Sequence, residues 1–170
     1  PANQLEDLAT AIGPFSINGN AITPVTGTLE LDKSNGTSFF YGRNFQTNSK
    51  SPSVINTPGL LSPPMIYAKG DGFIINTGNT IDPDNYDPDG AGTVTAVPNN
   101  DFVAHRLWHL PGNNSLVFQY GQYSYGTFNQ CIQRFSSESI LLPDGLTEGG
   151  YLVAIIVVEE GQTDLTVSDA

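Results

Sequence analysis

The sequence predicts a mainly β fold, either an antiparallel β-sandwich or a strongly bent antiparallel sheet, with one or two short helices. Short stretches of alternating polar and apolar residues recur along the 170 residues, and 18 glycines and 12 prolines separate them. A run of β-branched residues near the C-terminus indicates a buried strand. A chain of this length can form one domain with a hydrophobic core. We expect a short helix or linker over residues 1–20 and a β-rich module over residues 21–170.

The N-terminal segment from Asn3 to Gly13 has the features of a short helix. Asn3 can cap it, Glu6 stands at the capping-box position, and Gly13 ends it. Its apolar residues share one helical stripe, which consists of Leu5, Leu8, Ile12 and Phe15. Such a stripe suits a helix that packs on its own domain, and it also suits the seam of a multi-chain fibre stalk. Fewer than two heptads do not separate these alternatives.

The following part of the chain changes to a period of two, which is typical of half-buried strands. Thr26 to Asp32 predicts one strand, and Asn35-Gly36 predicts a type I′ hairpin turn into a second strand from Thr37 to Tyr41. Residues 44–64 are rich in Ser, Asn, Thr and Pro and predict a long loop. Loops of this length usually form lids or binding surfaces.

The middle of the chain predicts five further strands, separated by turns that contain Gly, Pro or Asn. They cover Met65 to Ala68, Phe73 to Asn76, Thr93 to Val97, Phe102 to Leu110, and Leu116 to Tyr120. A helix follows, since Thr127 can cap it and its apolar residues keep the i, i+3, i+4, i+7 spacing. Those residues are Phe128, Cys131, Ile132 and Phe135.

The C-terminal part predicts two strands, Ile140 to Leu142 and Tyr151 to Val158. The second is a β-branched run without alternation, which indicates a strand buried on both faces at the centre of the sheet. An aspartate in place of Val157 should then prevent folding, because an unpaired buried carboxylate costs several kcal/mol.

The charge of the chain argues against nucleic acid as a partner. It has 17 acidic and 6 basic residues, a net charge of −11, and the basic residues are scattered. The longest apolar run, Leu152 to Val158, is too short to insert into a membrane. The single cysteine, Cys131, cannot form an intrachain disulfide and is interpreted as a small buried hydrophobe. The chain begins at Pro1 without a methionine, which suggests a processed chain or a fragment.

The acidic loop from Asp82 to Asp89 places four carboxylates within eight residues. Calcium binds oxygens in such flexible loops. However, the closing Glu of an EF-hand is absent, and a turn whose Asp side chains cap their own backbone explains the same residues. We predict no metal ligand, cofactor-binding residue or catalytic residue, and whether Asp82 to Asp89 binds calcium stays open.

Two histidines and the tryptophan lie on the predicted strand from Phe102 to Leu110. His105 and His109 would be about 13 Å apart on one face, too far to share a metal, and we expect surface or cross-strand positions. Trp108 is expected in the core, with sugar stacking as the alternative. No nucleophile elbow, zinc motif or phosphate-binding loop is present in the sequence.

A tyrosine cluster lies in the stretch from Tyr120 to Gly126, with Tyr123 and Tyr125 as its other members. Tyrosine combines a flat apolar face with a polar tip and suits interfaces and glycans. The cluster can equally seat the following helix on the sheet, and the two interpretations stay open.

Several spaced motifs between residues 36 and 165 resemble a module of tail fibre and related virion proteins of tailed bacteriophages, including marine and cyanobacterial ones. In order, they are Ile81-Asp82-Pro83, Tyr86-Asp87, Thr93 to Asn100, Phe102 to Trp108, Leu110-Pro111-Gly112, Val117 to Tyr123, Ile156-Val157-Val158 and Gly161 to Leu165. The resemblance implies a β-rich, trimeric virion module and supplies no catalytic residue.

The expected function is therefore structural and adhesive rather than enzymatic. The chain would be part of a phage tail fibre or receptor-binding apparatus, assembled in the host cytoplasm and carried on the virion. Its expected partners are two further copies, other tail or baseplate proteins, and a host surface glycan that it binds without hydrolysis. The alternative is a carbohydrate-binding module attached to an enzyme, and an enzyme such as a depolymerase comes third.

Overall fold

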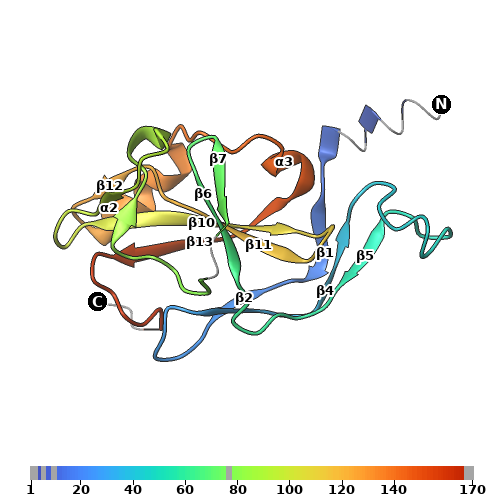
Figure 1. Cartoon of the computed structure of the whole chain (residues 1–170), viewed down its shortest axis with the longest axis horizontal. Coiled ribbons are helices and arrows are strands. Elements are labelled where there is room, and N and C mark those ends of the chain that lie inside the picture. Colours follow the sequence, from blue (N-terminus) through green and yellow to red (C-terminus); the bar gives the residue numbers. More distant parts are fainter. Residues whose placement is uncertain (1–3, 5–6, 9–10, 76–77, 167–170) are drawn as a thin grey trace.

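The computed structural model describes residues 4, 7–8, 11–75 and 78–166 (Figure 1). Strands contain 38% of the described residues and helices 14%, which confirms a mainly β fold. The strands are β1 (Phe15–Gly19), β2 (Ile22–Pro24), β3 (Leu31–Lys33), β4 (Gly36–Phe39), β5 (Val54–Thr57), β6 (Met65–Lys69), β7 (Gly72–Ile75), β8 (Asn85–Tyr86), β9 (Thr95–Ala96), β10 (Phe102–Leu110), β11 (Ser115–Gln119), β12 (Ser124–Tyr125) and β13 (Tyr151–Glu159). The described helices are η1 (Pro88–Gly90), α2 (Phe128–Arg134), η2 (Phe135–Ser137) and α3 (Leu146–Gly149).

The main sheet is built around β10. Strands β11 and β12 pair with one edge of β10, β13 pairs with the other, and β6 and β7 continue the sheet beyond β11. The β6–β7 and β10–β11 hairpins confirm the predicted strands and turns. The sheet is mixed rather than antiparallel throughout, because β11 runs parallel to β6. The long connection from β7 to β10 makes this parallel pairing possible.

Both faces of the main sheet are covered. On one face, Leu107 and Phe118 belong to a core that also contains Leu31 of β3. On the other face, Trp108 and Leu146 form a second core with residues of β6 and β11. Alternate residues of β10 point into the two cores, so this strand is buried almost throughout. The expected core position of Trp108 is confirmed.

The central position predicted for Tyr151 to Val158 is wrong. β13 pairs with β10 alone among the described strands, so it lies at the edge of the main sheet. Most of its side chains, including that of Val157, are only half-buried, and Val158 alone is fully buried. A run of β-branched residues indicates that side chains pack on both faces of a strand. It does not indicate whether that strand lies in the middle or at the edge of its sheet. The expectation that Val157→Asp prevents folding therefore loses its basis.

The predicted hairpin at Asn35-Gly36 is also wrong. β3 pairs with β2, whereas β4 lies between β1 and β5 in a separate sheet. Neither residue has the positive φ that a type I′ turn needs. The Asn35 side chain instead accepts a hydrogen bond from the Gly59 N–H at 2.6 Å. The predicted loop 44–64 contains β5, because its residues complete the sheet beside β4.

The predicted helix after Thr127 is confirmed as α2. The Thr127 hydroxyl accepts a hydrogen bond from the Gln130 N–H at 3.2 Å, as an N-cap does. Residues 140–142 do not form the predicted strand, because side chains bind their backbone. Gln119 of β11 donates to the Leu141 carbonyl, and Gln122, between β11 and β12, both donates to and accepts from Leu141. No helix of the described residues is long and apolar enough to cross a membrane.

The predicted N-terminal helix is described only in part. Gln4, Asp7, Leu8, Ala11 and Ile12 are helical, whereas Asn3, Leu5 and Glu6 lie outside the described residues. Leu8 and Ile12 are 57% and 56% exposed, and Phe15 of β1 is also exposed. β1 itself belongs to the β-sheet region, since it pairs with β4.

Candidate functional site

The carboxylates of the acidic loop bind groups of their own chain. Asp87 is fully buried and accepts hydrogen bonds from the backbone N–H groups of Gly70, Gly92 and Thr93, at 2.5, 2.8 and 3.1 Å. Asp82 accepts from the Tyr120 hydroxyl at 2.9 Å. Within the described ranges, no three Asp, Glu, His or Cys side chains are grouped as metal ligands. These carboxylates tie the loop to the main sheet.

The two histidines of β10 are in the core, so the expected surface position is wrong, while their cross-strand position is confirmed. The Nδ1 atom of His105 accepts a hydrogen bond from the Gly121 N–H at 3.0 Å, and its ring packs against that of Phe118 in a tilted arrangement. Burial lowers the pKa of His105 to about 3. A neutral, enclosed imidazole of this kind is a packing residue.

The tyrosine cluster uses its hydroxyl groups internally. Tyr123 donates to the Ser139 carbonyl at 3.0 Å, and Tyr125 donates to Glu138 at 2.7 Å. With Tyr120 bound to the acidic loop, all three polar tips hold neighbouring segments on the sheet. This favours the interpretation in which the cluster seats the helical segment. Cys131 is the buried residue of α2, and burial raises the pKa of its thiol to about 11, so the thiol stays protonated near neutral pH.

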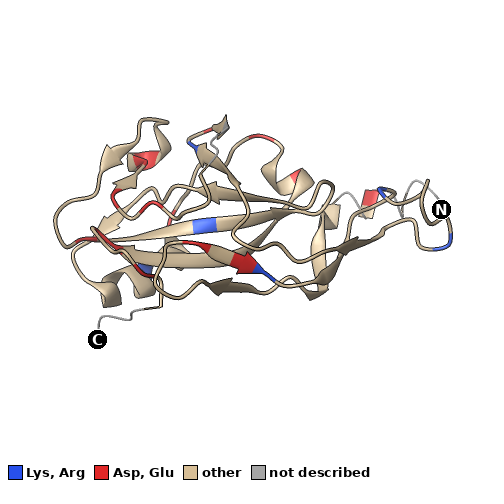
Figure 2. Cartoon of the chain, turned by 60° about the horizontal axis from the view of Figure 1, so that its bottom comes forward, with Lys and Arg blue, Asp and Glu red and all other residues tan. Residues whose placement is uncertain are grey.

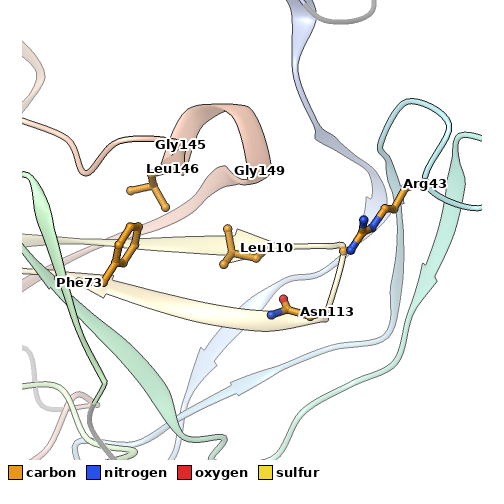
Figure 3. A pocket seen from close by; sticks show the side chains of 8 residues that line it. Arg43, Phe73, Leu110, Asn113, Gly145, Leu146 and Gly149 are labelled. Atoms are coloured by element: carbon orange, nitrogen blue, oxygen red, sulfur yellow. The ribbon is translucent and has the colours of Figure 1, made fainter.

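An open hollow of about 250 Å³ lies beside the turn that joins β10 and β11 (Figure 3). Figure 3 shows Arg43 at one end of the hollow, Leu110 in the middle, and Phe73 and Leu146 toward the other end. Asn113 of the turn contributes its amide. The hollow thus combines an apolar floor with one cation and one amide. Its residues come from four segments that are far apart in the sequence.

Arg43 also lines a second hollow, of about 480 Å³, in the loop between β4 and β5. The other lining residues include Phe45, which is 63% exposed, and Gln46. Turns order this loop: Asn44 donates its side-chain amide to the Val54 carbonyl at 2.7 Å. The start of the predicted loop 44–64 therefore presents an aromatic ring and an amide on the surface, next to the guanidinium of Arg43.

Beneath this region, seven polar groups form a closed ring of hydrogen bonds. They are the side chains of Lys33, Asn20, Ser38, Tyr151, His109 and Asn114, and the carbonyl of Pro58. Lys33 is fully buried, and its ammonium also reaches the carbonyls of Ser34 and Thr57. The members come from the main sheet, the β1–β4–β5 sheet and the β2–β3 ribbon and its flanking residues, so the ring holds these parts together.

The orientation of the Asn114 side-chain amide determines which atom is the donor in each bond from Asn114 to Ser38. The Asn114 amide nitrogen donates to Pro58 at 3.0 Å, so its oxygen faces His109 Nε2, which must carry the proton. His109 Nδ1 then accepts from the Tyr151 hydroxyl at 2.8 Å, and the Tyr151 oxygen accepts from Ser38 at 2.8 Å. Every donor meets an acceptor only while His109 is neutral. The ring also holds the turn at Asn114, next to the hollow.

Burial lowers the pKa of His109 to about 4, and the nearby Lys33 charge acts in the same direction. In the unfolded chain the pKa is about 6.5. Between these values the unfolded chain binds a proton that the folded chain does not. The stabilisation is therefore complete above pH 6.5 and is lost as the pH falls toward 4.

We expect this residue to account for about 3 kcal/mol of the stability lost between pH 6.5 and 4. The measurement is urea unfolding at several pH values, for the wild type and for His109→Gln, which does not titrate. The variant should have the shallower dependence on pH, because His105 and the carboxylates are common to both proteins. Parallel curves would show that His109 is not the group that titrates.

Sequence reasoning missed the ring, although one signal was available. Leu29, Leu31 and Lys33 stand at alternate positions, which places Lys33 on the same face of the chain as two core residues. No comparable signal marks Tyr151 or Asn20, because their partners are distant in the sequence.

The two hollows offer apolar contact, amide groups and a single cation. Among the described residues that line them there is no Asp, Glu, His or Cys. This chemistry suits the binding of a ligand with an apolar face and polar or anionic substituents.

Comparisons with known proteins found no family model, curated protein or solved structure that matches the chain.

Proposed function

We propose that the chain is a structural component of a phage tail fibre or receptor-binding apparatus and contributes to attachment of the virion to the host surface. It would act as a homotrimer together with other tail or baseplate proteins, without catalysis. The observation that carries the proposal is the exposed apolar N-terminal segment, formed by Leu8, Ile12 and Phe15. The resemblance of residues 36–165 to fibre modules supports it.

The N-terminal segment favours assembly because apolar side chains among its described residues are exposed in the single chain. Leu8 and Ile12 occupy a helical stripe, and more than half of each side chain is exposed in the single chain. Each such side chain gains roughly 1.5 to 3 kcal/mol when it is fully removed from water. Packing against the same segments of two neighbouring copies provides that burial in a fibre stalk.

Within the same proposal, the fold is sandwich-like. The β2–β3 ribbon contributes Ile22 and Leu31 to the core on one face of the main sheet. We take this ribbon and the neighbouring β1–β4–β5 sheet as the second layer.

The assembly is tested by light scattering on the wild type and on Ile12→Asp. We expect the aspartate to prevent three-fold association, because it places a charge in the apolar stripe. Leu61→Asp is the matched control, since Leu61 is 84% exposed and lies outside the stripe. It should leave the mass unchanged. A stable wild-type monomer at micromolar concentration would contradict the homotrimer.

The adhesive role is tested by incubating the protein with capsule or lipopolysaccharide from susceptible bacteria. We expect retention without release of reducing ends, and loss of retention in Phe45→Ala and Arg43→Ala. Steady release that disappears when a single Asp or Glu is replaced would overturn the non-enzymatic proposal.

A carbohydrate-binding module attached to an enzyme is the second candidate. The exposed ring of Phe45 beside Gln46 favours it, because aromatic faces and amides are the groups on which sugars dock. Such a module would retain glycan without three-fold association, so the masses of the wild type and Ile12→Asp separate the two candidates.

A further inference from the structure

The outer edge of β13 is an open strand edge. β13 pairs along its length with β10, and no described strand pairs with its other side. An unpaired edge presents N–H and C=O groups that can bind another strand, and natural proteins usually guard such edges with charge, proline or a bulge. Whether β13 is guarded depends on which of its groups point outward.

The hydrogen bond from the Glu160 N–H to the Asp101 carbonyl, 2.9 Å long, sets the direction of the groups in β13. In an antiparallel ladder, alternate residues bond to the neighbouring strand. Val158 and Ile156 therefore bond to β10, whereas Val157 and Ile155 direct their backbone groups outward. Glu159 fits this alternation, because its N–H donates to the Gln162 side chain at 3.1 Å instead.

The two ends of the edge are guarded, and its middle is not. A bulge interrupts the pairing near Leu152, and Gln162 caps Glu159 at the other end. Between them, the outward groups of Ile155 and Val157 have no hydrogen-bond partner within the described part of the chain.

The side chains along this edge are apolar and partly exposed. The seven residues from Leu152 to Val158 include no charge, Pro or Gly. Leu152 is exposed, and Ile155 and Val157 are half-buried. Helix α2 packs next to β13 and presents Phe128 and Ile132 to the exterior. In water the edge therefore leaves both backbone groups and apolar surface without a partner.

We propose that β13 pairs antiparallel with β13 of a second copy, across a two-fold axis near Ile156, so that the two main sheets become one. Ile155 of each copy then lies opposite Val157 of the other, and the outward groups of both residues bond across the axis. Pairs of β-branched residues are among the favourable cross-strand neighbours.

The charge at the end of β13 selects this orientation. Glu159 and Glu160 follow the apolar run. Antiparallel pairing places the two Glu pairs at opposite ends of the new ladder, whereas parallel pairing would bring four carboxylates together. We infer that the second strand belongs to another copy of the chain because the edge is complementary to itself. Its middle is uncharged and β-branched, and its acidic residues lie only at the C-terminal end.

This contact uses a different surface from the N-terminal stripe, so it does not depend on the proposed trimer. The experiment measures the number of chains by light scattering, from the chain mass of 18.2 kDa, in the wild type, Val157→Lys, Ile12→Asp and the double variant. A lysine at Val157 can lay its stem along the apolar surface, so the chain should still fold. Leu61→Lys is the control for an added surface charge.

We expect the wild type to consist of two stalk trimers joined at β13. Val157→Lys should then halve the number of chains in both backgrounds, from six to three and, with Ile12→Asp present, from two to one. Leu61→Lys should change neither number. An unchanged mass for Val157→Lys in both backgrounds overturns the pairing of β13. Halving by Val157→Lys together with no effect of Ile12→Asp supports the β13 contact and contradicts the N-terminal trimer.

Hydrogen exchange on the wild type tests the same contact without a substitution. The Ile155 and Val157 amides should exchange slowly in the assembled protein and rapidly after dilution, while the Ile156 amide, which bonds to β10, stays protected at both concentrations. Rapid exchange of Ile155 and Val157 at all concentrations overturns the proposal.

Discussion

Glu138→Gln is expected to lower the free energy of unfolding by about 3 to 5 kcal/mol, because it removes one partner of a buried ion pair. The Arg106 guanidinium and the Glu138 carboxylate are 2.6 Å apart, and their side chains are 5% and 3% exposed. Without the carboxylate, the Arg106 charge stays buried and uncompensated. Arg106 Nη1 already has no hydrogen-bond partner among the described residues, so little else there can compensate.

The effect should extend to the helical segment above the sheet. Glu138 also accepts a hydrogen bond from Tyr125, and Arg106 donates to the Phe135 carbonyl at 3.2 Å. The pair therefore fastens η2 and the end of α2 to β10 and β12. We expect amide exchange to accelerate in this segment more than in the β6–β7 hairpin.

The measurement is the urea midpoint at constant slope, with Glu148→Gln as the matched control on an exposed carboxylate of α3. The control should stay within about 0.5 kcal/mol of the wild type. Replacing Arg106 and Glu138 together by methionine should recover much of the loss, because no unpaired charge is then left in the interior. A Glu138→Gln protein as stable as its control would contradict the buried pair.

Lys33→Met is expected to cost about 3 kcal/mol or more, because it removes the buried ammonium that donates hydrogen bonds to four oxygens. The Lys33 ammonium donates to Asn20 and Pro58 at 3.0 Å each and to Ser34 at 3.1 Å. Methionine fills a similar volume but supplies no N–H group. Burial lowers the pKa of Lys33, because it disfavours the charged form. The surrounding oxygens stabilise the charged ammonium in the interior.

Lys50→Met is the matched control, since Lys50 lies exposed in the loop between β4 and β5. It should change stability by less than about 0.5 kcal/mol. Because the ring is closed, Lys33→Met should also shift the NMR signals of Asn114, which reaches the ring through Pro58 and His109. Equal stabilities of the two variants would show that the ring does not hold the sheets together.

The two buried cations, Lys33 and Arg106, differ in burial from the other basic residues of the chain. Figure 2 shows acidic residues on loops, strands and helical turns, and basic residues that do not join into one patch. The composition gives the number of charged residues, 17 acidic and 6 basic, and does not show that Lys33 and Arg106 lie inside.

The sequence by itself determined part of the local structure. Turn residues placed the β6–β7 and β10–β11 hairpins, and a hydroxyl followed by helically spaced apolar residues placed α2 after Thr127. These features depend on neighbours along the chain, whose chemistry is visible in the sequence. The mainly β class follows from the same local signals.

Only the tertiary structure decided which strands neighbour one another and which polar groups are buried. Tyr151 to Val158 has the composition of a central strand. In the structure, however, β10 is the strand with partners on both edges, and β13 lies at the edge of the sheet. The hollow near Arg43 and the ring around His109 unite segments up to about a hundred residues apart. A periodic pattern reports the environment of a side chain on one element, whereas edges, hollows and hydrogen-bonded rings arise where separate elements meet.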